Sequence, residues 1–226
     1  MTAALPFADR RDAGRQLARA LLADPPNNPV ILALPRGGVP VAYEIARRLH
    51  APLGLLLVRK IGAPGYPEYG IGAVLDGSTP SVVIDEGAAR ATGADKQYIE
   101  ETVQRELAEI ERRKRAYGTP AMPSLAGRSV ILVDDGIATG ATVRAALRGL
   151  AHSHADRIVL AVPVAPSDIV AWLGAHCDRV VCLASPEPFL SVGSHYRDFS
   201  QLEDAEVVKL LALSGHAAAD EHHPAR

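Results

Sequence analysis

The sequence has few cysteines, little net charge and no long apolar run. Cys177 and Cys182 are its only cysteines, and we expect packed thiols there rather than a disulfide or a metal pair. The net charge of -2 and the pI of about 6.4 do not indicate a broad surface for nucleic acid or membranes. No apolar run approaches the ~20 residues of a membrane span, and residues 1–15 hold no apolar core of signal-peptide length. These absences predict a cytoplasmic protein with neither a membrane nor nucleic acid as a partner.

Three common motifs are absent as well. A GxxxxGK[ST] phosphate loop is excluded because no lysine follows Gly140. No GxGxxG opens a helix, so the dinucleotide-binding fingerprint is missing. There is also no GxSxG elbow, and an α/β-hydrolase would therefore have no nucleophile.

Short apolar stretches alternate with helical stretches along most of the chain. Hydrophobic residues make up 48% of the 226 residues and charged residues 22%, as in soluble globular proteins. The alternation predicts an α/β fold with a doubly wound, mainly parallel sheet. We expect its core to comprise residues 1–61 and 119–226, with an inserted α+β subdomain at 62–118. The expected strands of the core are 30–34, 53–58, 130–133, 158–162 and 179–183.

The expected insertion begins with a segment rich in glycine and proline. Residues 61–72 hold four glycines and two prolines, which predicts a mobile loop. Residues 70–75 and 81–84 are predicted to pair as a hairpin across a tight turn. Residues 94–117 predict one long, highly charged helix that buries a single seam. The apolar residues of that seam are Ile99, Val103, Leu107 and Ile110.

The stretch from Val130 to Thr142 carries the strongest functional pattern. A buried strand is followed by Asp134 and Asp135, then by a loop of small and hydroxyl residues, then by a helix. The start of a helix offers free N–H groups and a positive dipole end, which suits a phosphate. Two carboxylates would repel a phosphate alone, so the ligand should also bring hydroxyl donors or a divalent cation. Ribose 5-phosphate fits that requirement.

This stretch resembles the phosphoribosyl pyrophosphate (PRPP) motif of type I phosphoribosyltransferases. The resemblance implies a transfer of phosphoribosyl from PRPP to a nitrogenous base, with release of pyrophosphate. It implies that Asp134 and Asp135 hold the ribose hydroxyls, and that Mg²⁺ enters with PRPP and meets these two carboxylates. The residues implied to bind the 5-phosphate are Ile137, Ala138, Thr139, Gly140, Ala141 and Thr142.

Two further segments resemble the same family. The loop around Arg36, Gly37 and Gly38 is similar to the pyrophosphate loop, since two glycines allow close approach and a guanidinium grips phosphate oxygens. Arg59 and Lys60 are similar to the pair that precedes the mobile loop of adenine-type members. All three segments are expected at one edge of the sheet, with Asp134, Asp135, Arg36 and Lys60 as the catalytic residues. The alternatives are a glycine turn with Arg36 in water, and a solvated charged pair.

The acceptor base is not identified by the sequence. Several purine enzymes of the family have an acidic residue where this chain has Ala138, whereas adenine- and uracil-type members have alanine. Phe189, Tyr196 and Phe199 are candidates for a stacking face on the base side, and the alternative is that they are core aromatics. A non-catalytic sensor of PRPP or nucleotides and a hydrolase acting on a ribosyl phosphate remain alternative functions. A homodimer is considered as the assembly under each of these functions.

Overall fold

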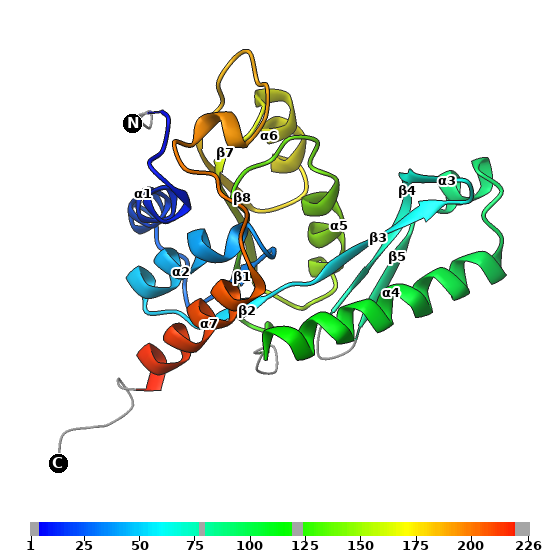
Figure 1. Cartoon of the computed structure of the whole chain (residues 1–226), viewed down its shortest axis with the longest axis horizontal. Helices are drawn as coiled ribbons and strands as arrows, with labels where there is room; N and C mark the ends of the chain where they lie inside the picture. The colour runs from blue at the N-terminus through cyan, green and yellow to red at the C-terminus, as the bar shows by residue number, and fades with distance from the viewer. Residues whose placement is uncertain (1–4, 77–79, 119–123, 220–226) are drawn as a thin grey trace.

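The computed structural model describes residues 5–76, 80–118 and 124–219, with backbone alone for 215–219. Its central feature is a parallel sheet of five strands in the order β2-β1-β6-β7-β8 (Figure 1). The strands are β1 (Pro29–Ala33), β2 (Leu53–Leu55), β6 (Ser129–Val133), β7 (Arg157–Val164) and β8 (Arg179–Ala184). Every adjacent pair is parallel, and β1 aligns with β6 from Pro29↔Ser129 to Ala33↔Val133.

Helices cover both faces of this sheet because its strands are apolar on both faces. Val30 and Leu32 join one core cluster, whereas Ile31 and Ala33 join the other. One face is covered by α1 (Arg10–Leu22), α2 (Gly38–Leu49) and α7 (Asp204–Ala219), the other by α5 (Ala141–Leu150) and α6 (Ser167–Gly174). A short 3₁₀ helix, η1 (Gly193–His195), lies in the long connection from β8 to α7. The predicted doubly wound, mainly parallel α/β fold is therefore confirmed.

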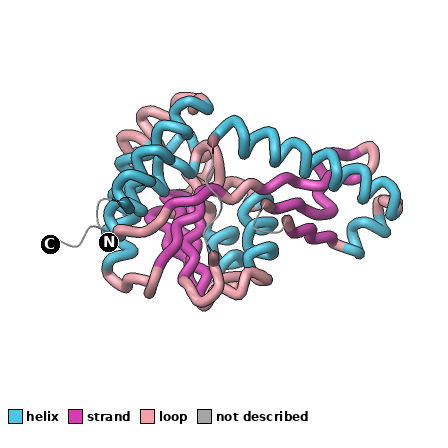
Figure 2. Tube along the Cα trace, turned by 90° about the horizontal axis from the view of Figure 1, so that it is seen from below, coloured by secondary structure: helices cyan, strands magenta, loops and turns pink. Residues whose placement is uncertain are grey.

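A second, antiparallel sheet projects to one side of the parallel sheet (Figure 1). It contains β3 (Val58–Ala63), β4 (Tyr66–Leu75) and β5 (Ser81–Ile84), and the predicted pairing of 70–75 with 81–84 is confirmed. Two helices follow, α3 (Glu86–Ala91) and the long α4 (Lys96–Tyr117), which runs along the sheet (Figure 2). The sheet also packs against α5, where a Cβ on Gly149 would meet the Leu75 side chain.

The loop predicted at residues 61–72 is wrong as secondary structure. This segment forms most of a hairpin, in which β3 and β4 pair antiparallel from Val58↔Leu75 to Ala63↔Tyr66. The register shifts around Gly62, so the glycine and proline residues are accommodated by irregularities in the ladder rather than by a loop. The second sheet also begins at Val58, inside the range predicted for the core. The mobility of the segment and the division into two domains stay predictions.

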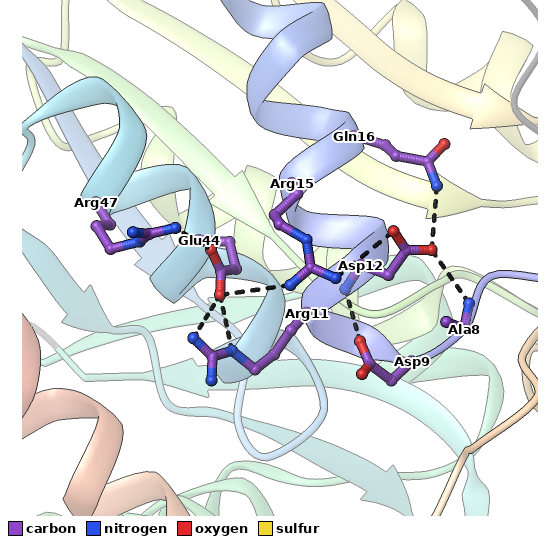
Figure 3. A network of polar contacts seen from close by, with 8 residues as sticks. All are labelled: Ala8, Asp9, Arg11, Asp12, Arg15, Gln16, Glu44 and Arg47. Atoms are coloured by element: carbon purple, nitrogen blue, oxygen red, sulfur yellow. Dashed lines mark hydrogen bonds and ion pairs between the residues drawn. The ribbon is translucent and has the colours of Figure 1, made fainter.

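One buried carboxylate joins α1 to α2. Glu44 is only 1% exposed, and guanidinium groups of Arg11, Arg15 and Arg47 converge on it (Figure 3). The Arg11 and Arg47 contacts are 2.6 and 3.0 Å, and Arg15 lies 3.9 Å away. A buried charge is tolerated when it is paired and hydrogen-bonded in this way. The network fixes α1 against α2. The first residue of α1 is Arg10, which reaches the carboxyl ends of the central strands.

Candidate functional site

The candidate site lies where the strand order of the parallel sheet reverses. From β1 the chain crosses through α2 to β2, on one side, whereas from β6 it crosses to β7 and β8, on the other. In open α/β sheets, ligands bind in the crevice outside the carboxyl ends of the strands at such a switch point. Here the two strand ends are followed by residues 34–38 and by Asp134 and Asp135. The predicted pyrophosphate loop and the predicted ribose-binding acids are therefore neighbours.

Gly37 and Gly38 bring the first loop directly against the end of β6. A Cβ on Gly38 would lie 2.6 Å from the carbonyl oxygen of Val133, and a Cβ on Gly37 would overlap the carboxylate of Asp135. The loop is pinned by its backbone, since the Gly38 N–H donates to Leu34 O at 3.0 Å. Glycine is thus required here by close approach, as expected for a loop whose backbone faces a ligand.

Asp134 and Asp135 occupy a half-buried turn at the end of β6. The Asp135 N–H donates to Asp134 Oδ1 at 2.9 Å. Burial raises the pKa of the Asp134 carboxyl well above its usual range, and the neighbouring Asp135 raises it further. Burial also raises the pKa of Asp135, although Arg10 opposes this effect. Burial therefore disfavours ionisation of both acids, and of the two Asp135 is the one that pairs directly with a cation, Arg10.

Arg10, in the first turn of α1, is a site residue that sequence reasoning missed. Its Nε lies 2.7 Å from Asp135 Oδ2, and the two side chains are 11% and 14% exposed. The same guanidinium donates from Nη1 to the Ser200 carbonyl oxygen at 2.9 Å, and it lies 3.8 Å from the centre of the Phe199 ring. The partners are 125 positions apart in the sequence, so no local pattern signals the pair.

The predicted phosphate loop opens α5. Gly140 precedes the helix with a φ of 73°, a conformation that favours glycine. The first bond of the helical ladder runs from the Arg144 N–H to Gly140 O at 2.8 Å. The N–H groups of Ala141 and Thr142 therefore lie outside that ladder, at the positive end of the helix. Both residues are exposed, as are Ala138 and Thr139, so an anion can approach this turn.

Ile137 is the exception among the predicted phosphate-binding residues. Its N–H donates to Val164 O at 2.9 Å, and its side chain is buried. Because this N–H is already bonded to the last residue of β7, it is not available to a phosphate in this structure. Ile137 instead anchors the loop to β7.

The predicted cationic residues face carboxylates of this chain. Arg36, whose peptide bond with Pro35 is cis, lies 3.6 Å from Asp204 at the start of α7. Arg59 and Lys60 were expected at the end of a core strand, but they lie within β3 of the second sheet. Arg59 Nε lies 2.8 Å from Glu106, and Lys60 Nζ lies 3.0 Å from Glu68. Within the described residues, no hydrogen bond or ion pair joins Arg59 or Lys60 to the acids at the end of β6.

The predicted base-side aromatics have different environments. Tyr196 is buried against Phe7, with ring centroids 5.4 Å apart, and its hydroxyl donates to the Asp135 carbonyl oxygen at 2.5 Å. Burial raises the pKa of the Tyr196 phenol. Phe189 is half-buried, 5.1 Å from the His195 ring, and Phe199 is exposed. Tyr196 therefore packs as a core aromatic, which was the alternative, and leaves Phe199 and Phe189 as the accessible rings.

The start of the chain pairs with the segment that carries these aromatics. The Phe7 N–H donates to His195 O at 2.9 Å, and Phe7 O accepts from the Arg197 N–H at 2.8 Å. The Asp198 N–H then donates to Ala8 O at 3.0 Å. Residues far apart in the sequence thus form one cover beside Asp135.

The donor set at the site suits Mg²⁺ that arrives with a phosphate ligand. Carboxylate oxygens are ligands that Mg²⁺ prefers, and proteins commonly bind it through one or two carboxylates together with substrate phosphates. Residues 5–76, 80–118 and 124–219 contain no group of three or more histidine, cysteine or acidic side chains placed to hold a metal. Because Asp135 is paired with Arg10, Asp134 is the acid better placed to meet such an ion.

The chain belongs to the phosphoribosyl transferase domain family, which it matches over residues 9–173. It is 47% identical over 208 residues to the Mycobacterium tuberculosis protein named "Putative phosphoribosyl transferase Rv0571c", and equally to the corresponding protein of strain CDC 1551. These matches cover 91% of this chain and 46% of the relatives, so the chain spans about half their length. The solved structure of TT1426 from Thermus thermophilus is 43% identical with a TM-score of 0.80, over 92% of this chain and 98% of that chain.

The family expected from Val130 to Thr142 is therefore confirmed. One further finding concerns membranes: no helix within the described ranges is long and apolar enough to cross one.

Proposed function

We propose that this protein transfers phosphoribosyl from PRPP to a nitrogenous base and releases pyrophosphate. The observation that carries the proposal is the contact between two loops at the switch point of the sheet. Gly37 and Gly38 lie against Asp134 and Asp135, and α5 begins a few residues beyond them. One ligand with a pyrophosphate, a ribose and a 5-phosphate has the three chemical parts that these neighbouring segments suit.

The two acids would act on the ribose. Asp134 and Asp135 would accept hydrogen bonds from its hydroxyls and favour the positive charge that develops on the ring as the glycosidic bond to pyrophosphate breaks. The raised pKa of Asp134 means that its negative charge is poorly solvated in the free protein. An arriving positive charge or hydroxyl donor is therefore bound more strongly there than in water.

The 5-phosphate and the pyrophosphate would be held at opposite sides of these acids. The N–H groups of Ala141 and Thr142, with the Thr139 and Thr142 hydroxyls, would hold the 5-phosphate at the start of α5. Arg36 and the glycine backbone would hold the pyrophosphate, and Arg36 would exchange Asp204 for phosphate oxygens. Mg²⁺ bound by the pyrophosphate, with Asp134 nearby, would supply further positive charge against the leaving group.

Lys60 is a less direct candidate for the same step. It pairs with Glu68, whose side chain is almost fully exposed, so the interaction is a weak surface ion pair. We propose that Lys60 and Arg59 reach the pyrophosphate only if the β3–β4 hairpin moves. Replacing Lys60 with alanine tests whether this lysine acts on the pyrophosphate, because turnover should then fall while binding of ribose 5-phosphate stays unchanged.

The decisive experiment measures pyrophosphate release from PRPP and Mg²⁺ across a panel of purine and pyrimidine bases. Release that depends on one base supports the transferase and names its acceptor. Release that is independent of any base indicates hydrolysis. Binding of PRPP in calorimetry without release under any condition would leave a sensor, and no binding at millimolar PRPP would refute the proposal. The matched control is the double variant Asp134→Asn with Asp135→Asn, measured in the same panel.

A further inference from the structure

The ion pair between Arg10 and Asp135 joins α1 to the end of β6, and it is well shielded. Nε of Arg10 lies 2.7 Å from Oδ2 of Asp135, and neither side chain is more than 14% exposed. Most surface ion pairs contribute little, but a shielded pair of this length constrains the position of both groups. The Asp135 carboxylate also lies against Gly37, which has no side chain to displace it. The carboxylate is thus held between α1 and the pyrophosphate loop.

Arg10 also holds the segment that follows Tyr196. Its Nη1 donates to Ser200 O at 2.9 Å, and its guanidinium stacks 3.8 Å from the Phe199 ring centre. The guanidinium therefore uses its Nε–H for an acid of the site, and its Nη1–H and planar face for the cover beside it. Lysine has a single ammonium and no planar face, so it cannot reproduce both contacts.

The pair does not exhaust the hydrogen-bonding capacity of Asp135. An ionised carboxylate has about four acceptor positions, and the Nε contact uses one on Oδ2. The remaining positions suit a ribose hydroxyl. A guanidinium that pairs with one oxygen orients the other, as residues that support a binding group do elsewhere.

We propose that Arg10 is a positioning residue, which sets the Asp135 carboxylate for the ribose hydroxyls and ties it to the Phe199–Ser200 segment. This inference rests on the proposed function, because it assigns Asp135 to ribose. It makes α1 part of the ribose site, although no residue of α1 carries a recognisable motif. It also separates Arg10 from Arg11, its neighbour of the same type, which pairs with Glu44 away from the acids.

The test compares two phosphate-containing probes, only one of which contains a ribose. Ribose 5-phosphate and inorganic pyrophosphate, each with Mg²⁺, are titrated into the wild type, Arg10→Ala, Arg10→Lys and the control Arg11→Ala. Arg10→Ala should weaken the binding of ribose 5-phosphate by about 10- to 100-fold, which corresponds to losing one charge-assisted contact between Asp135 and the ribose. The affinity for pyrophosphate should stay within about threefold of the wild-type value. Arg10→Lys should recover part of that loss. Arg11→Ala should lower the melting temperature without changing the preference between the probes.

A double-variant cycle tests whether Arg10 acts through Asp135. In an Asp135→Asn background, Arg10→Ala should change ribose 5-phosphate affinity by less than about threefold, because the coupled group is already lost. Additive losses would overturn the inference, as would an equal loss for both probes, an unchanged affinity or a tighter one. If Arg10→Ala does not fold, wild-type ribose affinity in a folded Arg10→Lys variant would overturn it instead. If the wild type binds neither PRPP nor ribose 5-phosphate, the proposed function fails, whereas normal binding in both wild type and Arg10→Ala refutes only this inference.

Discussion

The prediction that bears most directly on the site concerns Asp134 and Asp135, replaced singly and together by asparagine. Asparagine keeps the size of the side chain and removes its charge. A hydrogen bond to a charged group is worth about 1.5–3 kcal/mol, roughly twice a neutral bond. Losing two such bonds should weaken PRPP binding or turnover by about two to four orders of magnitude, at about 1.4 kcal/mol per factor of ten. Each single variant should lose about half of that on a logarithmic scale.

The effect on stability should have the opposite sign. A carboxyl whose pKa is raised by folding binds more protons in the folded than in the unfolded state, so stability falls as the pH rises through that range. The pKa of Asp134 is raised by burial and by Asp135, and the pKa of Asp135 is raised by burial. Removing the Asp134 charge should therefore raise the melting temperature at neutral pH, whereas removing Asp135 also leaves the buried Arg10 guanidinium without its partner. The gain should vanish below about pH 4, where both acids are protonated in either state.

The two single variants should differ in the size of this gain. Arg10 offsets part of the cost of burying Asp135, and its effect on Asp134 is smaller. Asp134→Asn should accordingly stabilise the protein more than Asp135→Asn. A matched control is Asp178→Asn, because Asp178 accepts a hydrogen bond from the Ile158 N–H at the other end of the sheet. That variant should leave PRPP affinity unchanged.

Melting temperature and PRPP affinity, measured on the same samples, decide between function and structure. A well-folded double variant with unchanged affinity would refute the assignment of these acids to the ligand. A lower melting temperature with retained affinity would show instead that the acids are structural, as a cap or an ion-pair partner would be. Calorimetry at pH 7 and circular dichroism melts at several pH values are sufficient.

Three further predictions concern other parts of the chain. Burial raises the pKa of Asp76 from 3.8 to about 6. Asp76→Asn should therefore add up to about 3 kcal/mol to the free energy of unfolding above pH 6, and nothing below about pH 4. Denaturant melts at several pH values check this. Gly37→Ala would force the Asp135 carboxylate aside, so it should lower the free energy of unfolding by about 1–3 kcal/mol and weaken PRPP binding. In the control Gly174→Ala a Cβ meets nothing within 4 Å, so stability should be unchanged or higher in the same assays. Arg36→Ala removes an exposed ion pair and should change stability by less than about 1 kcal/mol while pyrophosphate affinity, measured by calorimetry, falls at least about tenfold.

The parts of the fold that local sequence determines were predicted correctly. The strand at 129–133 is apolar at every position after the first, and its burial on both faces follows directly. Asp9 is of a residue type that favours the position before a helix, and its carboxylate accepts the Asp12 N–H at 2.6 Å. The order of strand, acids, small loop and helix also agrees with the structure from β6 to α5. These features depend on residues within one or two turns of each other.

The errors arise where composition or distance conceals the structure. Glycine and proline in residues 61–72 predicted a loop, but irregular pairing lets a strand contain them. Tyr196 was left open between base stacking and core packing, and the contact with Phe7, distant in the sequence, favours the core. Arg10 could not be assigned at all, because its role depends on a partner 125 residues away. Long-range contacts of this kind leave no periodic signal in the sequence.

The pairing of Phe7 with residues 195–197 has a consequence for synthesis on the ribosome. Phe7 cannot complete these backbone hydrogen bonds until residues 195–197 have been synthesised. Contacts between such distant residues form slowly, because the loop between them must close first. A nascent chain that ends near residue 190 contains all five strands of the parallel sheet but lacks both α7 and the cover beside Asp135. We therefore expect a chain cut near residue 190 to bind ribose 5-phosphate more weakly than a chain that includes residues 195–200.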